Sequence, residues 1–226
     1  MSEHIDEKEL AFRRELSRRT LSMPSRTDRD DQRDTDPAVI KRIGGEISRL
    51  IQEEQLEEAR ERLDRELADH PDEPGLLNLE FALNMILKPF GGYEKAREST
   101  GRAMELAVER GSAYFVRVAI NNMGLVAQKE GHEEFSLAMY LAAHFIDGMA
   151  IPPIANIAGW YSRKGELAKA QQWIDKLLEF YPDWCSHDEI TTFLEKDEML
   201  GNLRSYEPFI RSVLDEIKKH RQESSI

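Results

Sequence analysis

The sequence predicts an all-α protein built from antiparallel helix pairs, and three observations support this fold class. From Pro37 onward, apolar residues recur at helical spacing, and no stretch alternates apolar with polar residues as a half-buried strand would. Chain-breaking residues divide this part of the chain into segments of about 13 to 19 residues with short connections, which permit antiparallel neighbours. Small residues also recur: Gly131 and Gly165 are 34 residues apart, as are Gly124 and Ala158. A period of this length is typical of repeat architectures.

The composition fits charged helices and argues against several classes of function. Hydrophobic residues make up 40% of the 226-residue chain and charged residues 33%, with a net charge of −12. Because phosphate groups and anionic lipids attract clustered Lys and Arg, we expect no nucleic-acid partner and no binding to anionic membranes. The single cysteine, Cys185, excludes an intramolecular disulfide and a cysteine zinc site, and it fits a reducing compartment.

Targeting and membrane signals are not expected in this sequence. The first residues lack the apolar core that a signal peptide needs. No run approaches the roughly 20 apolar residues of a membrane span. We therefore expect a cytoplasmic protein without membrane insertion.

Residues 1–36 form a charged tail that differs from the rest of the chain. The stretch 25–36 has no apolar residue, so it cannot bury enough surface to offset ordering entropy and is expected to be a disordered linker. Before it, Ile5, Phe12 and Leu16 fall on one side of a possible helix. Two interpretations stay open: a frayed tail, or a docking helix that packs on the helix pairs or on a partner.

Residues 37–184 are expected to form four helix pairs in succession. A single pair could not bury its apolar stripe alone, whereas stacked neighbours bury a continuous one. Two adjacent glycines, Gly44 and Gly45, weaken the first helix. The expected pairs are 38–53 with 55–70, 74–88 with 92–110, and the windows 117–150 and 151–184.

The last window shows the pattern of one pair most clearly. Ile154, Ile157 and Tyr161 form the apolar stripe of its first helix. Ala158 and Ala170 are small, as required where two helices cross closely. Gly165 makes the turn between the helices, and Pro182 ends the unit because proline cannot continue a helix.

This pattern resembles the tetratricopeptide repeat position by position. The preceding window keeps the register through Ile120, Gly124 and Tyr140, with Ser136 and Gly148 as departures. The resemblance implies a right-handed superhelix of helix pairs, an α-solenoid. Residues 185–226 are similar to the capping helices that follow bacterial arrays of this family. Such a cap would turn apolar residues inward: Phe209, Ile210, Val213 and Ile217.

In the family, the first helix of each pair lines a concave groove, and the resemblance implies which residues point into it here. Asn122 and Asn156 share one place and would form a ladder that pairs with the backbone of an extended peptide. Lys129 and Arg163 share another and could attract a carboxylate. The full candidate set is Phe81, Met85, Asn121, Asn122, Leu125, Lys129, Asn156, Gly159 and Arg163.

Alternatives remain at these positions. The polar residues could simply be solvated, or cap local backbone, with the partner bound elsewhere. Gly159 would allow close approach of a partner. Phe81 and Met85 occupy places where the chaperone-type carboxylate clamp has Lys and Asn, so that clamp is not supported. They suggest an apolar pocket instead, or packing against helix 92–110.

No arrangement typical of an enzyme is found in the sequence. There is no phosphate-binding glycine loop, and no histidine pair has the helical spacing of a metal site. Cys185 and His187 lie too close in sequence to suggest a convincing catalytic or metal site. We therefore expect no enzyme, no cofactor and no metal. The predicted function is a protein-binding adaptor or scaffold; a dedicated chaperone for a secreted or assembling partner, or a self-assembling structural protein, are the alternatives.

Overall fold

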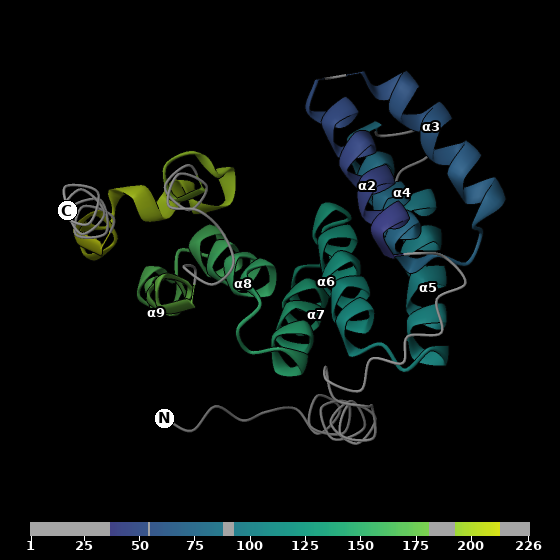
Figure 1. Ribbon diagram of the computed structural model, residues 1–226. Helices are drawn as coiled ribbons and strands as arrows, with labels where there is room; N and C mark the ends of the chain where they lie inside the picture. The colour runs from purple at the N-terminus through teal and green to yellow at the C-terminus, as the bar shows by residue number, and fades with distance from the viewer. Residues whose placement is uncertain (1–36, 54, 88–92, 181–192, 213–226) are drawn as a thin grey trace, which may run out of the picture. The chain divides into compact units, whose positions relative to one another are not determined.

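The computed structural model describes residues 37–53, 55–87, 93–180 and 193–212, and within them every regular element is helical (Figure 1). The all-α fold class is therefore confirmed for this part of the chain. From α2 to α7 each helix packs against the next along the chain, and α8 packs against α9. Their bounds are α2 Pro37–Gln52, α3 Leu56–Asp69, α4 Pro74–Leu87, α5 Glu94–Glu109, α6 Ala113–Lys129, α7 Glu133–Ile146, α8 Ile151–Arg163 and α9 Leu167–Phe180, followed by the 3-10 helix η2 Glu198–Ser205.

Some predictions concern residues outside these ranges. The charged tail of residues 1–36 is one of them. The others are the closing residue Pro182, the pair Cys185 and His187, and the cap residues Val213 and Ile217.

The recurring glycines make one and the same turn. Gly131 lies between α6 and α7 with φ 83°, and Gly165 lies between α8 and α9 with φ 76°. A positive φ is easy only for a residue without Cβ, so this conformation accounts for the glycine at both places. In each turn the N–H of the following residue, His132 or Glu166, donates to a helix carbonyl, at 2.8 and 3.0 Å. The 34-residue period of these glycines therefore corresponds to a repeated cap at the C-terminal end of a helix.

The small residues lie where helices cross closely. A Cβ added to Gly124 in α6 would lie 2.6 Å from Cε1 of Tyr140 in α7. Tyr140 is fully buried, and its hydroxyl donates to Gln128 at 2.8 Å. Ser136, the departure from alanine, is also fully buried, and its hydroxyl donates to the carbonyl of Glu133 at 2.7 Å. The serine is therefore tolerated because its polar group is satisfied within its own helix.

The chain divides into two compact units, residues 1–146 and 147–226, each of which is described by itself. The first unit contains α2 to α7. Its core includes a cluster of Ile43, Ile47 and Leu63 with residues of α4, and a second cluster at α5 to α7. Apolar burial of this kind is the main source of stability for such helices.

A polar connection crosses the first unit between three helices. Arg60 of α3 donates to the Asn84 side chain of α4, and Asn84 donates to the hydroxyl of Ser99 in α5 at 3.2 Å. Asn84 is only 3% exposed, so its amide would be costly to bury without these partners.

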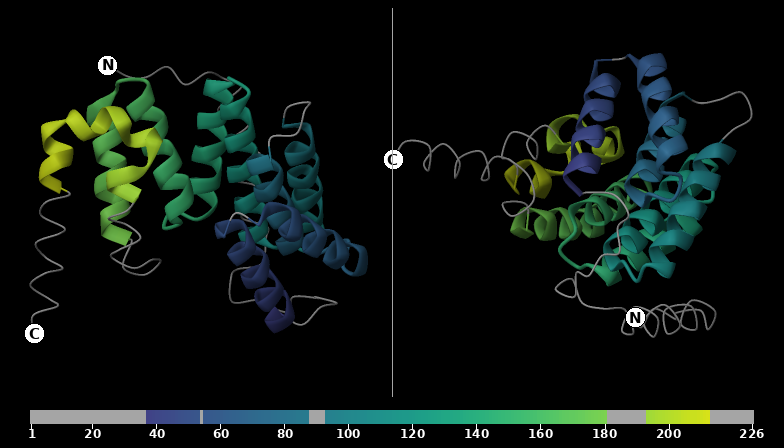
Figure 2. Two further views of the ribbon diagram at one scale, coloured as in Figure 1. Left: turned by 90° about the horizontal axis from the view of Figure 1, so that it is seen from above. Right: turned by 45° about the vertical axis from the view of Figure 1, so that its right-hand side comes forward.

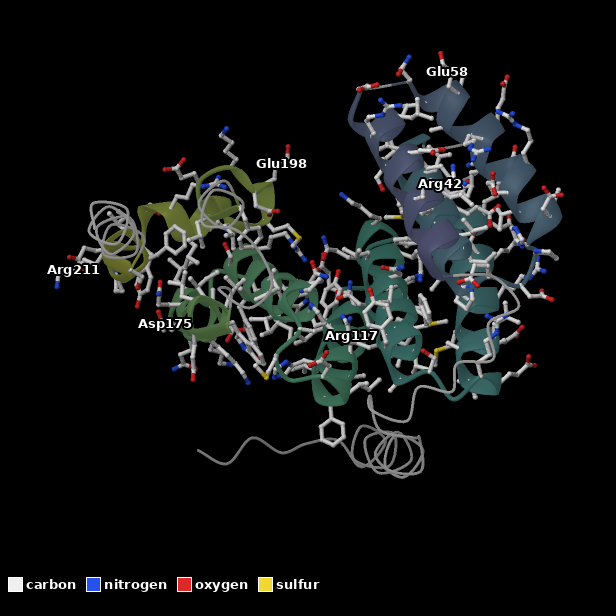
Figure 3. The ribbon with its side chains drawn as sticks, in the orientation of Figure 1. Arg42, Glu58, Arg117, Asp175, Glu198 and Arg211 are labelled. Atoms are coloured by element: carbon white, nitrogen blue, oxygen red, sulfur yellow. The ribbon has the colours of Figure 1, made fainter. Side chains whose placement is uncertain are left out.

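The second unit contains α8, α9 and η2, and η2 lies against α8 (Figure 2). Its core joins residues of α8 and α9 to residues after position 193, among them Leu194, Leu200, Leu203 and Phe209. A hydrogen-bonded group adds to this packing: Gln171 donates to Ser212 at 3.0 Å, and Ser212 donates to Asp175, labelled in Figure 3, at 3.4 Å. The chain thus returns to cover its last helix pair. The predicted cap residue Ile210, however, is 41% exposed.

Candidate protein interface

Helices α4 and α6 lie next to each other in the first unit and carry most of the predicted groove residues. We name their shared surface the α4–α6 face and define it by Asn78, Met85, Ile86, Asn122, Leu125 and Lys129. The start of α6 is fixed by Ser112, whose hydroxyl accepts the N–H of Phe115 at 3.4 Å.

An amide pair joins the two helices at the centre of this face. Asn122 donates from Nδ2 to Oδ1 of Asn78 at 3.2 Å. Asn122 is 8% exposed and Asn121 is 6% exposed, so both lie mainly inside the helix layer. The sequence prediction did not include Asn78. The sequence offers little that points to Asn78, because this residue lies 44 residues before Asn122 and not at the repeat period.

Phe81 packs inside the unit. It is 5% exposed and forms a buried cluster with Ala96 of α5 and Val126 of α6. Met85 and Leu125 are partly buried against this cluster. Packing against α5 was one of the two interpretations open for Phe81, and it is the arrangement found here. An apolar strip formed by Met85 and Leu125 therefore remains at the surface above the cluster.

The C-terminal ends of α4 and α6 add exposed groups to this strip. Ile86 is 46% exposed and follows Met85 in α4. Lys129 is exposed and is the last residue of α6. The face therefore combines apolar surface with a positive charge, because α4 and α6 run in the same direction and end on the same side of the unit (Figure 1).

The remaining candidates lie in the second unit. Asn156, Gly159 and Arg163 belong to α8, whereas Asn122 and Lys129 belong to the first unit. The ladder of Asn122 with Asn156, and the shared place of Lys129 with Arg163, therefore stay predictions.

The 3-10 helix η2 approaches α8 closely at Gly159. A Cβ added there would lie 2.7 Å from Cβ of Met199 in η2. Nearby, Asn202 of η2 donates to the carbonyl of Ser162 at 3.0 Å. This side of α8 is thus covered by the C-terminal segment and is not open to a partner. The register of η2 was not predictable from the sequence, because a 3-10 helix does not follow the period of an α-helix.

The described residues contain no group of three or more His, Cys, Asp or Glu side chains that could hold a metal ion. None of the described helices combines the length and the apolar character needed to cross a membrane.

Comparisons with known proteins give a structural likeness but no match in sequence. No protein-family model matches the chain, and no curated protein matches it. A solved structure similar to it is the crystal structure of PilW, described as a widely conserved type IV pilus biogenesis factor. The identity is 13% and the TM-score 0.37, over 81% of this chain and 96% of that chain. The tetratricopeptide likeness therefore stays a resemblance, carried by residue spacing and by the helix pairs.

Proposed function

We propose that this chain is a non-enzymatic, cytoplasmic protein–protein interaction module that binds a segment of another protein along the α4–α6 face. The observation that carries the proposal is the combination found there: apolar Met85, Ile86 and Leu125 beside the exposed cation of Lys129. Apolar side chains supply binding free energy when a partner covers them. A charge at the rim adds orientation and specificity.

The amides have a different role in this proposal from the one expected from sequence. Asn122 is engaged with Asn78 and mostly buried, so the pair holds α4 and α6 at a fixed spacing. A partner would contact the more exposed groups at the ends of the two helices. The segment best suited to them has a bulky apolar side chain followed by a carboxylate, which would meet Lys129.

A binding role is favoured over a catalytic one by the chemistry of the groups present. The face offers one amine, amides and hydrocarbon, and no pair of titratable groups that could act as acid and base. An adaptor or scaffold needs only a rigid surface of this kind, which stacked helix pairs provide.

The test is affinity purification with crosslinking mass spectrometry, comparing the natural chain with Ile86→Asp. Because Ile86 is 46% exposed, the substitution should leave folding intact while placing a charge against the partner's apolar group. We expect recovery of the crosslinked partner to fall at least about tenfold. The matched control is Phe135→Asp, another exposed apolar residue, which lies on α7 and should have no effect.

The result that would overturn the proposal is equal recovery with Ile86→Asp and the natural chain. Light scattering separates self-assembly from adaptor function. A mass that rises with protein concentration and is lost in Ile86→Asp would show that this face binds a second copy of the chain.

A further inference from the structure

Three large apolar side chains are exposed at helix ends on one side of the first unit. Val108 is 45% exposed, Tyr114 is 54% exposed and Phe145 is 61% exposed. We name these three residues the end patch. Single exposed apolar residues are common, whereas neighbouring ones mark an interaction surface.

The connections of the helices bring these residues to one end. Gly111 and Ser112 join α5 to α6, so Val108 in the last turn of α5 lies near Tyr114 in the first turn of α6. Helix α7 runs back along α6, which returns Phe145 to the same end. A core cluster contains or contacts the chain neighbours of these three residues. Ala107 belongs to the cluster, and Phe115 and Ile146 pack against it.

The Tyr114 ring is held in place while remaining exposed. It meets the ring of Phe115 edge to face at 5.0 Å between centroids. The guanidinium of Arg117, labelled in Figure 3, lies 5.0 Å from the Tyr114 centroid. A ring fixed in this way loses little side-chain entropy when a partner covers it.

The described chain begins at this same end. Helices α2, α4 and α6 run in one direction, because each is followed by an antiparallel partner (Figure 1). Pro37, the first residue of α2, therefore lies at the same end of the unit as Tyr114. Two helix spacings of about 8–10 Å each separate α2 from α6. Residues 22–36 can span about 50 Å when extended, which is ample.

The segment before this linker has the chemistry that the end patch would bind. Ile5, Phe12 and Leu16 fall on one side of a helix, with charged residues between them. Residues 25–36 contain no apolar residue, so this part of the linker could not cover the patch. We propose that residues 5–21 form a helix that docks through Ile5, Phe12 and Leu16 onto the end patch of the same chain.

Tethering favours the same chain over a second copy as occupant. A short linker gives an effective concentration of about millimolar, far above the working concentration of a cytoplasmic adaptor. Docking would also bury aromatic surface that otherwise promotes association. The N-terminal helix is thus an internal ligand of the first unit, separate from the α4–α6 face.

The test is hydrogen exchange of residues 5–21 by mass spectrometry in the full chain, with a synthetic peptide of residues 1–24 as the reference. Docking should slow exchange of the segment at least about tenfold relative to the peptide. The double variant Tyr114→Ser/Phe145→Ser should restore the peptide's rate. Both side chains are exposed, so these substitutions should leave folding intact. The matched control Phe135→Ser should leave exchange slow.

Three results would overturn the proposal. The first is that the segment exchanges in the full chain as fast as in the peptide. The second is that exchange of the segment stays slow in Tyr114→Ser/Phe145→Ser. The third is that the slowing of exchange depends on protein concentration, which would identify a second copy as the occupant.

Discussion

At the scale of single residues, the glycines divide by what surrounds their Cα atoms. Gly124 faces the buried Tyr140 ring, whereas an added Cβ at Gly101 or Gly45 would meet no atom within 4 Å. The first is required by packing. The other two only weaken their helices, since glycine costs about 1 kcal/mol relative to alanine in a helix interior.

We therefore expect opposite effects from the same substitution. Gly124→Ala should destabilise the protein by about 1–3 kcal/mol, because the Tyr140 ring must shift. Gly101→Ala in α5 should stabilise it by up to about 1 kcal/mol. Urea unfolding followed by circular dichroism measures both. If Gly124→Ala were as stable as Gly101→Ala, the close crossing of α6 and α7 would be wrong.

A second prediction concerns the polar connection through Asn84. Replacing Asn84 with alanine leaves Arg60 and the hydroxyl of Ser99 without this partner and should cost about 1–3 kcal/mol. Ser99→Ala should cost less, because Asn84 then loses one partner but still accepts from Arg60. A double-mutant cycle should show the two effects to be non-additive. Additive effects would mean that the side chains do not interact.

At the scale of elements, the C-terminal segment completes the second unit. Leu200 and Leu203 of η2 are fully buried together with Ile154 and Ile174 from α8 and α9. A repeat stack needs such a cover, because its last pair otherwise exposes an apolar surface.

Two substitutions within the C-terminal segment, one of a buried and one of an exposed residue, test whether this segment caps α8 and α9. Leu203→Ala should destabilise α8 and α9 by about 2–5 kcal/mol, because it leaves a cavity in their core. Ile210→Ala should change stability by less than about 0.5 kcal/mol, because Ile210 is 41% exposed. Hydrogen exchange of the α8 and α9 amides reports both. Equal protection in the two variants would contradict the cap.

The sequence predicted the helices well because their signals are local. Apolar spacing and breakers placed 74–88 within a residue of α4, Pro74–Leu87, and Gly131 and Gly165 marked the turns. The residues of the site were harder to predict from the sequence, because they come together only when the helices stack. Asn78 reaches Asn122 from outside the repeat period, and Met199 reaches Gly159 from a 3-10 helix. Neither contact has a sequence spacing that predicts it.

At the scale of the whole molecule, charge and surface chemistry support the kind of partner proposed above. The net charge of −12 opposes association with nucleic acid or anionic lipid. A local cation beside apolar surface, as at Lys129, instead suits a partner segment that joins an apolar side chain to a carboxylate. Lys129→Glu should therefore weaken partner binding at least about tenfold. In a titration with the crosslinked partner, Lys129→Gln should show a smaller loss.

The most direct test of partner binding along the α4–α6 face places a photo-crosslinking amino acid at position 129, and separately at Glu105 of α5 as the control. Both sites are exposed in the first unit, but only position 129 belongs to this face. The account predicts one specific crosslinked protein from position 129 and none from position 105. The same crosslinks from both positions, or crosslinks from position 105 alone, would contradict it.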